Sequence, residues 1–381
     1  MKLYVLAGEP SGDQLAGPLL AALKERFGEA LQLRGVGGEE MERQGLQSLY
    51  DLNDFAVMGI VEVVRHLPRL RRHINNLVAD IEAWKPDILL SVDSPGLCFR
   101  IAHQIKTDSI CKIHYVAPSV WAWKPERAQK IAGFLDGLLT VLPFEPPYFT
   151  PHGLDTRFVG HSLLERGAAR VPPALAHSQQ HLLLAPGSRV NEIKRMLPLY
   201  LKVSKELRKR FKDIKIIIPT VANVEALVRS MTKGLDVQVV TGSKARWEAF
   251  ARADAALVTS GTVALELACL GVPTVVGYLM NPLSAWYVRR KLRLERVSLP
   301  NILLKRDVFP ELLMRDCTQE KILDQLVPML ETLEARERMQ KESAQLRAML
   351  SPPSPYPLPS EAAASMMLDI FNAKRAGVKN I

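Results

Sequence analysis

Features that define several common classes of protein are missing from this chain of 381 residues. Aromatic residues make up only 6% of it, and no stretch combines basic and aromatic residues as single-strand nucleic-acid platforms do. No apolar run reaches the roughly 18–20 residues that a membrane span requires. The four cysteines form no C-x-x-C pair and no signal peptide is seen, which is typical of a reduced cytoplasmic chain. We therefore expect no nucleic-acid partner and no membrane span.

Motifs that hold dinucleotides or divalent metals are also missing. The chain contains neither the G-K-[ST] of a P-loop nor the G-x-G-x-x-G of a dinucleotide fold. It has no D-x-D pair and no closely spaced cluster of histidine and carboxylate residues. These absences argue against a nicotinamide dehydrogenase and against a tightly held metal, and we expect no cofactor.

What the chain does have is a basic balance in an ordinary globular composition. Lysine and arginine number 50 against 40 acidic residues, which gives a net charge of +10 and a pI near 9.4. At about 100–200 residues per domain, the length favours two domains. The positive charge favours an anionic partner, so we expect a phosphorylated substrate or an acidic membrane surface.

Short apolar runs alternate with helical patterns from one end of the chain to the other. Such alternation predicts α/β domains with parallel sheets and right-handed crossovers. The strand candidates are 3–7, 31–36, 87–92, 112–116 and 138–142, then 181–184, 214–219, 237–240, 255–258 and 274–278. Two rounds of this pattern predict two Rossmann-like, doubly wound domains that face a central cleft, with ligands at the carboxyl ends of the strands.

Two proline-containing stretches mark the expected boundaries. ARVPPALAHSQQ, residues 169–180, interrupts all periodicity and predicts domains of residues 1–168 and 169–360. SPPSPYPLPS, residues 351–360, excludes a helix or central strand and indicates an extended connector. A final helix within 361–381 either crosses back to the first domain or forms a frayed tail.

In the second half, two strands end in small-residue turns that open helices. APGSR at 185–189 brings helix N–H groups and a guanidinium to one turn, as anion sites do. SGT at 260–262 opens the next such helix, and Glu266 one turn later suits the paired hydroxyls of a ribose. One such turn is common in any α/β domain, but two with hydroxyl-bearing residues favour an anion and nucleotide site.

In the first half, polar residues follow two neighbouring strands. Asp93 stands at the end of DILLSV, either as a general base or as the cap of the next helix. His114 lies in the following strand and is either catalytic or a satisfied core residue. Trp121 shares a loop with a second tryptophan, where both either pack on the core or hold a ligand.

The turn AGEPSGD, residues 7–13, is acidic where a phosphate would need bare N–H groups. Glu9 can accept hydrogen bonds from the hydroxyl groups of a ligand, and Ser11–Gly12 can let the backbone approach a ligand closely. Asp13 is expected to be structural, at the start of the helix.

The stretch FAVMGIVEVVRHLPRLRRHI, residues 55–74, joins an apolar run to a basic one. Apolar side chains with a basic fringe suit an interfacial membrane contact, although a buried element with a solvated basic end fits as well. WYVRRKLRLERV, residues 286–297, permits the same two interpretations. The membrane-contact candidates are Val57, Ile60, Val61, Val64, Arg65, Arg69 and Arg72.

Taken together, these motifs resemble bacterial lipid-A-disaccharide synthase over nearly the whole chain. The stretches that carry the resemblance, in the family's order and spacing, are AGEPSGD (7–13), AVMGIVEV (56–63), HYVAPSVWAW (114–123), APGSR (185–189), SGTVALE (260–266) and VSLPN (297–301). The second and third of these are highly specific, whereas the short glycine turns alone are not.

The resemblance implies an inverting GT-B-type glycosyltransferase of Gram-negative lipid A biosynthesis. That family transfers 2,3-diacylglucosamine from UDP-2,3-diacylglucosamine to the 6-hydroxyl of 2,3-diacylglucosamine 1-phosphate without a metal. The products are a β-1,6-linked disaccharide and UDP. It further implies a cytoplasmic protein, peripheral on the cytoplasmic face of the inner membrane. Some members exchange C-terminal domains within a dimer, so a homodimer is a candidate assembly.

By position, Asp93 matches the family's candidate base for the acceptor hydroxyl. One departure is that many members read D-x-P-D-F where this chain has DSPGL, so a second carboxylate is absent and Asp93 stands alone. The expected UDP-binding residues are Gly187, Ser188, Arg189, Glu192, Ser260, Gly261, Thr262, Glu266 and Asn301. The expected acceptor-side residues are Glu9, Ser11, Gly12, Met58, His114 and Trp121.

Two other functions remain open at this point. A UDP-sugar 2-epimerase uses a similar two-domain frame and needs no lipid contact. A non-catalytic, membrane-bound sensor of UDP-sugar or lipid would bind the donor without turning it over.

Overall fold

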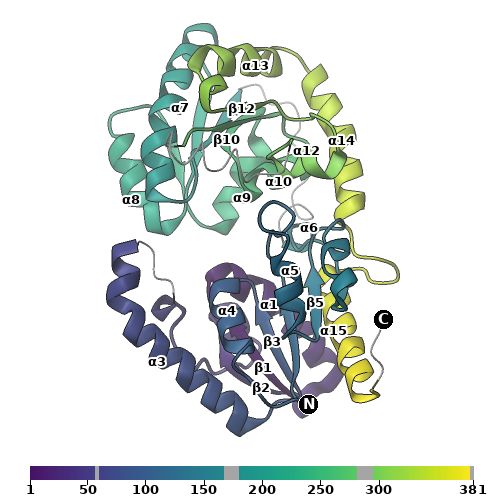
Figure 1. The fold of residues 1–381 in the computed structure, drawn as a ribbon. Helices are drawn as coiled ribbons and strands as arrows, with labels where there is room; N and C mark the ends of the chain where they lie inside the picture. Colours follow the sequence, from purple (N-terminus) through teal and green to yellow (C-terminus); the bar gives the residue numbers. More distant parts are fainter. Residues whose placement is uncertain (56–59, 167–179, 281–294, 378–381) are drawn as a thin grey trace. The chain divides into compact units, whose positions relative to one another are not determined.

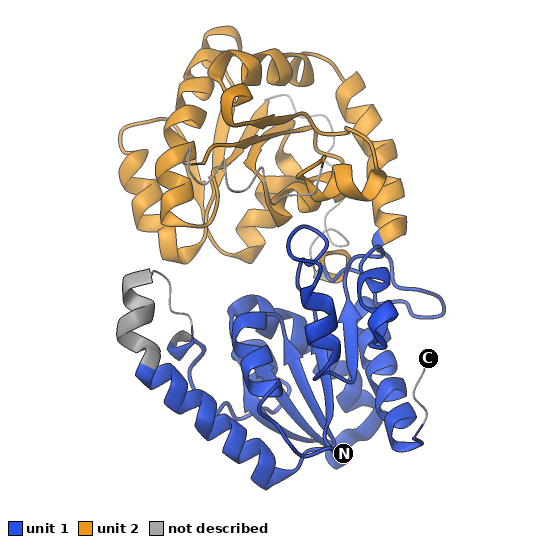
Figure 2. Cartoon of the chain, in the orientation of Figure 1, with its two compact units in different colours: residues 1–162, 350–381 blue, residues 163–349 orange. Residues whose placement is uncertain are grey.

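The computed structural model describes residues 1–55, 60–166, 180–280 and 295–377, without the side chains of residues 53 and 60–67 (Figure 1). The chain divides into two compact units, which are described in turn (Figure 2). Unit 1 consists of residues 1–162 and 350–381, and unit 2 of residues 163–349. Most of the expected linker, 169–180, lies outside the described residues.

Unit 1 is built on a six-stranded parallel sheet of order β2-β1-β3-β4-β5-β6. Its helices cross over between strands, as parallel pairing requires. The strands are β1 (Lys2–Ala7), β2 (Gln32–Val36), β3 (Ile88–Val92), β4 (Cys111–Tyr115), β5 (Gly137–Thr140) and β6 (Asp155–Phe158). The main helices are α1 (Pro10–Phe27), α3 (Ile60–Trp84), α4 (Pro95–Ala102) and α5 (Arg127–Ala132), with the short α2 (Glu39–Glu42) after β2.

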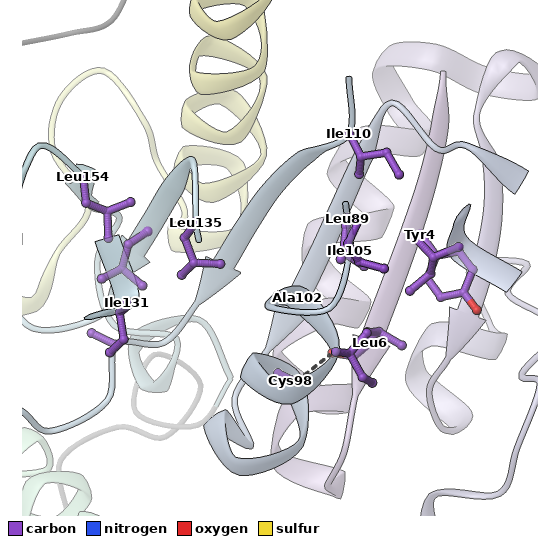
Figure 3. Packing of buried hydrophobic residues seen from close by; sticks show 14 of the residues in the cluster. Tyr4, Leu6, Leu89, Cys98, Ala102, Ile105, Ile110, Ile131, Leu135 and Leu154 are labelled. Atoms are coloured by element: carbon purple, nitrogen blue, oxygen red, sulfur yellow. Dashed lines mark hydrogen bonds between the residues drawn. The ribbon is translucent and has the colours of Figure 1, made fainter. Parts of the chain in front are cut away.

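The core of unit 1 lies between this sheet and its helices. β1 and β3 are largely apolar because both faces of the sheet are covered, and every residue of β3, including Ser91, is buried. Leu6 and Leu89 of the sheet pack beside Cys98 and Ala102 of α4 (Figure 3). Burial raises the pKa of the Cys98 thiol to about 12. This packing holds α4 against the sheet and so positions the turn that precedes it.

The last helix, α15 (Pro359–Arg375), belongs to unit 1. It packs on α1, β4 and β5 through fully buried alanines at 362–364. Gly137 of β5 makes room for it, because a Cβ there would lie 2.8 Å from the Ile370 side chain. Lys374 Nζ donates to Asp136 at 2.8 Å. The C-terminal segment is therefore an integral layer of unit 1.

Unit 2 repeats the architecture with a six-stranded parallel sheet of order β12-β11-β10-β7-β8-β9. The strands are β7 (His181–Ala185), β8 (Lys215–Pro219), β9 (Gln238–Val240), β10 (Ala255–Thr259), β11 (Thr274–Tyr278) and β12 (Glu311–Leu313). Its helices are α6 (Leu163–Arg166), α7 (Val190–Arg210), α8 (Ala222–Met231), α9 (Ser243–Arg252), α10 (Thr262–Cys269), α12 (Leu299–Leu304), α13 (Gln319–Glu331) and α14 (Glu334–Leu350).

The predicted fold class, two doubly wound parallel sheets, is confirmed. The apolar runs did not predict β6 and β12, which both lie at a sheet edge. Edge strands are short and polar, and the sequences DTRF and ELL carry no apolar run to reveal them. Within the described residues, no helix is long and apolar enough to cross a membrane.

Candidate active site

In each unit, parallel pairing brings the carboxyl ends of the strands to one edge of the sheet. In unit 1 the turns after β1, β3 and β4 follow neighbouring strands, because β3 pairs with both β1 and β4. In unit 2 the turns after β7 and β10 do the same. Side chains at these turns form the candidate site of each unit.

The turn after β1 packs directly on the turn after β3. A Cβ at Gly8 would lie 2.9 Å from Ser94 Cβ, and one at Gly12 would lie 2.8 Å from the Val92 carbonyl oxygen. Glycine is thus needed at both positions to let the backbones approach. The result is a hydrogen bond of 2.7 Å from Ser11 Oγ to Asp93 Oδ2 between residues 82 positions apart. Glu9 is exposed beside them.

Asp93 occupies an unusual backbone conformation at this edge. Its φ is +53°, that of Ser94 is +43°, and that of Val116 after β4 is +81°. Left-handed conformations outside glycine cost about 1–3 kcal/mol each and concentrate at functional sites. The Asp93 N–H donates to the Tyr115 carbonyl at 2.9 Å, which holds the turn to β4.

Asp93 does not cap α4. The N-cap residue is Ser94, and no side chain makes the capping hydrogen bond. The buried Ser94 hydroxyl has no hydrogen-bond partner within the described part of the chain. A half-buried carboxylate beside an unsatisfied hydroxyl is an arrangement suited to a bound polar ligand.

Asp13 has a different role in the same turn. Its carboxylate is buried and accepts hydrogen bonds from the N–H groups of Gly38 at 2.8 Å, Glu40 at 3.1 Å and Met41 at 3.1 Å. These groups belong to the start of α2. Asp13 therefore anchors the segment after β2, in agreement with the structural role expected for it.

His114 lies in the core. Its Nδ1 is 2.8 Å from Ser91 Oγ, its ring packs edge-on against Phe99 at 4.5 Å, and its Nε2 has no partner among the described residues. Burial lowers its pKa to about 3, so the imidazole stays neutral at physiological pH. It contacts solvent nowhere, since its exposure is 0%.

Trp121 is held by a residue that the sequence analysis missed. Its Nε1 donates to Glu145 Oε1 at 3.3 Å, and its ring packs on Phe144 with centroids 5.2 Å apart. Glu145 follows β5, is 2% exposed, and also accepts from the Leu142 N–H at 3.1 Å. Burial raises the Glu145 pKa to about 7. No motif or spacing in the sequence distinguishes this glutamate.

The expected membrane-contact segment is only partly described. Val57 and Met58 lie outside the described residues, as do the side chains of Ile60, Val61, Val64 and Arg65. Arg69 donates to Asp54 Oδ1 at 2.6 Å and to His73 Nε2 at 3.2 Å. Arg72 is exposed on α3. Of the second basic stretch, residues 286–294 are not described.

In unit 2, the turn after β7 is closed by its own glutamate. Glu192 Oε2 accepts from the N–H groups of Ser188 at 3.1 Å and Arg189 at 3.3 Å, and Glu192 Oε1 accepts from Arg189 Nη1 at 3.1 Å. Gly187 has a φ of +109°, and a Cβ there would lie 2.5 Å from Glu192 Oε2. The Arg189 side chain is 76% exposed. The N-terminus of α7 is therefore already capped by a carboxylate.

The turn after β10 is open by contrast. Gly261 and Thr262 are exposed, no side chain caps α10, and a Cβ at Gly261 would meet nothing closer than 4.0 Å. Free N–H groups at a helix N-terminus favour an anion. Of the two turns, this one has its donors available.

Glu266 and Arg246 form an ion pair that completes the open turn. Glu266, one helical turn after Thr262, accepts from Arg246 Nη2 of α9 at 3.3 Å. The sequence pattern predicted Glu266 at this site but not Arg246. Nothing in the spacing of α9 singles out this arginine among its basic residues.

Asn301 is fully engaged within the protein. Its Oδ1 accepts from the N–H groups of Val308 and Phe309, and its Nδ2 donates to the Phe309 carbonyl and to Glu311. It is 1% exposed. The amide therefore organises a loop, and any contact with a nucleotide would have to displace one of these bonds.

Glu311 of β12 joins that loop to the open turn. Its carboxylate accepts from the N–H groups of Val297 and Ser298, each at 2.9 Å, and from Ser298 Oγ at 2.7 Å. The Val297 carbonyl in turn accepts from Ser260 Oγ at 3.3 Å. Ser260 is thus fixed through Val297 by Glu311, which no sequence motif predicted.

No group of three or more histidine, cysteine or acidic side chains able to hold a metal ion occurs within residues that the structure describes.

Two doubly wound parallel sheets with flanking helices are the architecture of the GT-B class. A rhamnosyltransferase that acts on spinosyn shares this fold at a TM-score of 0.56 and 14% identity, over 97% of this chain and 99% of that one. A UDP-GlcNAc 2-epimerase from Neisseria meningitidis, solved with UDP-GlcNAc, shares it at a TM-score of 0.63 and 14% identity, over 97% and 99%. At these identities the likeness establishes the fold alone.

The family is set by sequence. The model of the lipid-A-disaccharide synthetase family matches residues 3–363. The lipid-A-disaccharide synthase of Gluconobacter oxydans is 38% identical over 97% of this chain and 91% of its own length. That of Rhodospirillum centenum is 41% identical over 84% of this chain and 82% of its own length. The chain belongs to the lipid-A-disaccharide synthase family, whose members are hexosyltransferases. This match supports the glycosyltransferase interpretation and not the epimerase one.

Proposed function

We propose that the protein transfers 2,3-diacylglucosamine from its UDP derivative to the 6-hydroxyl of 2,3-diacylglucosamine 1-phosphate, with Asp93 as the general base. Asp93 takes the hydroxyl proton while the hydroxyl oxygen attacks C1 of the donor sugar. The bond from C1 to the diphosphate oxygen breaks, and UDP leaves with that electron pair. One displacement inverts the α-linked donor to a β-1,6 disaccharide.

The observation that carries this proposal is the Asp93 carboxylate, half-buried at the end of β3 and oriented by the Ser11 hydroxyl at 2.7 Å. A base must be held within reach of the proton that it takes, and the Ser11 hydrogen bond and the left-handed turn support this role by fixing the carboxylate. Glu9 and the Ser94 hydroxyl are placed beside it and suit the hydroxyl groups of an acceptor sugar.

Unit 2 supplies the donor site in this proposal. The open N-terminus of α10, at Gly261 and Thr262, neutralises the diphosphate of the leaving UDP, and Glu266 receives the ribose hydroxyls. The Arg189 side chain is exposed and pairs with Glu192; in this proposal the guanidinium leaves Glu192 and pairs with the diphosphate. We assign Asn301 to shaping the site rather than to binding.

The acyl chains of both substrates require a contact with lipid. We assign it to the first turns of α3 and the residues just before it, on the inner-leaflet face of the membrane. We also propose a homodimer as the assembly.

Release of UDP from the two acylated sugars tests the base. Asp93→Asn keeps the shape of the side chain and should lower kcat by about 10²–10⁴-fold with little change in donor KM. Asp108→Asn, an exposed aspartate of the same unit, is the matched control and should stay near wild type. A residual rate within about threefold of wild type for Asp93→Asn would remove Asp93 from the mechanism.

A further inference from the structure

A groove of about 1120 Å³ lies in unit 1 between α3 and α4, which are neighbours in Figure 1. Leu70 and Ile74 of α3 form one apolar wall, and Phe99 of α4 with Phe134 forms the other. The two phenylalanine rings meet edge-on with centroids 5.5 Å apart. These apolar side chains, which we call the apolar floor of the groove, can cover an alkyl chain.

The rim of this groove is basic. Arg71, Arg72, Arg100 and His103 line it, and no aspartate or glutamate is among the described residues that do so. A second hollow of about 630 Å³ shares His103 with the first. Lys106, Lys112 and Lys130 lie around this second hollow. Positive charge therefore surrounds an apolar floor over a continuous stretch of surface.

The groove is separate from the proposed sugar site. Arg100 and His103 lie five and eight residues after Pro95, the first residue of α4, which corresponds to a rise of about 7–12 Å along the helix. They lie toward the C-terminal end of that helix, whereas Asp93 precedes its start. A ligand of the groove is accordingly not the reacting hydroxyl.

We propose that the groove binds one molecule of an acidic glycerophospholipid, its phosphodiester held by Arg71 and Arg100 and an acyl chain lying over Phe99 and Phe134. Guanidinium groups pair with phosphate oxygens in bidentate geometry. A zwitterionic lipid offers the same chains but adds a cation that the rim repels. The site deepens the membrane contact of the proposed function and does not depend on the sugar transfer.

Sedimentation of the full-length protein with phosphatidylcholine vesicles, with and without phosphatidylglycerol, measures this binding. Wild type should bind the phosphatidylglycerol vesicles more tightly. Each arginine near an acidic lipid surface contributes about fivefold in affinity, so the double variant Arg71→Gln/Arg100→Gln should bind them about thirtyfold more weakly. The matched control, Arg26→Gln/Lys85→Gln, loses the same charge from exposed positions of unit 1 outside the groove and should keep most of the affinity.

Gln104→Trp separates a defined site from a diffuse basic surface, because it fills the groove and leaves the charge unchanged. We expect it to weaken binding of monomeric dihexanoyl phosphatidylglycerol at least tenfold. An equal loss of vesicle affinity in the two double variants would overturn the proposal, and so would unchanged lipid binding by Gln104→Trp. Complete displacement of the lipid by inorganic phosphate or by the acylated sugar phosphate would also overturn it. Asp93→Asn should bind vesicles as wild type does, so failure of the catalytic proposal is visible on its own.

Discussion

The buried Glu145 makes the stability of unit 1 depend on pH in a calculable way. Burial raises the pKa of its carboxyl from the ordinary value of 4.5 to about 7. Below pH 4.5 the group is protonated in both the folded and the unfolded chain. Between these two values the unfolded chain releases the proton while the folded chain keeps it, so the free energy of unfolding falls as pH rises. Above pH 7 the loss is complete.

The size of the effect follows from the two pKa values. A difference of 2.5 units, 7 minus 4.5, corresponds to about 3 kcal/mol in total at 1.36 kcal/mol per unit. Between pH 5 and pH 8 about 2.5 kcal/mol of this should be lost. Because other groups titrate in the same range, the quantity to follow is the difference between wild type and Glu145→Gln, which cannot ionise.

Urea unfolding followed by tryptophan fluorescence measures that difference. From pH 5 to pH 8 wild type should lose about 2.5 kcal/mol relative to Glu145→Gln, whatever the offset between them at pH 5. The exposed Glu29 serves as control, since Glu29→Gln should run parallel to wild type at every pH. A wild-type curve parallel to that of Glu145→Gln, within about 0.5 kcal/mol, would show that the buried carboxyl does not keep its proton.

Three further outcomes follow from the packing. Gly35→Ala should lower the free energy of unfolding by about 3–5 kcal/mol, because the new Cβ would lie 1.9 Å from the Val5 carbonyl oxygen. Gly45 also has a positive φ but has open space around it, so Gly45→Ala should lower the free energy of unfolding by only about 1–2 kcal/mol. Equal losses for the two variants in urea unfolding would refute the steric reason. Glu311→Gln places an N–H donor opposite the N–H groups that the carboxylate now accepts from, and it should lower the free energy of unfolding by about 2–4 kcal/mol. Denaturant titration measures this loss, and a value below about 0.5 kcal/mol would contradict the role of Glu311 in the network. The Cys98 thiol, buried with a pKa raised to about 12, should resist iodoacetamide at pH 8 until urea is added, and rapid labelling of the native protein, seen by mass, would contradict its burial.

Much of the fold was open to prediction because its signals are local. Apolar runs and helical periodicity located the ten expected strands, since each depends on residues next to one another in the chain. The missed strands, β6 and β12, owe their existence to a neighbouring strand rather than to their own sequence. The candidate site was predictable to the extent that it stands at strand ends, as Asp93 and Gly261 do.

By itself, the amino-acid sequence determined the α/β class, the strand ends and the family, because periodicity, turn chemistry and motif spacing are all written along the chain. The tertiary structure alone decided which polar groups remain available. It places the Ser11 hydroxyl within hydrogen-bond distance of Asp93, and it lets Glu192 cap its own helix. It also occupies the Asn301 amide with hydrogen bonds inside the protein and buries Glu145. The physical reason is that hydrogen-bond satisfaction and burial depend on strand order and on contacts between distant residues, which no local pattern contains.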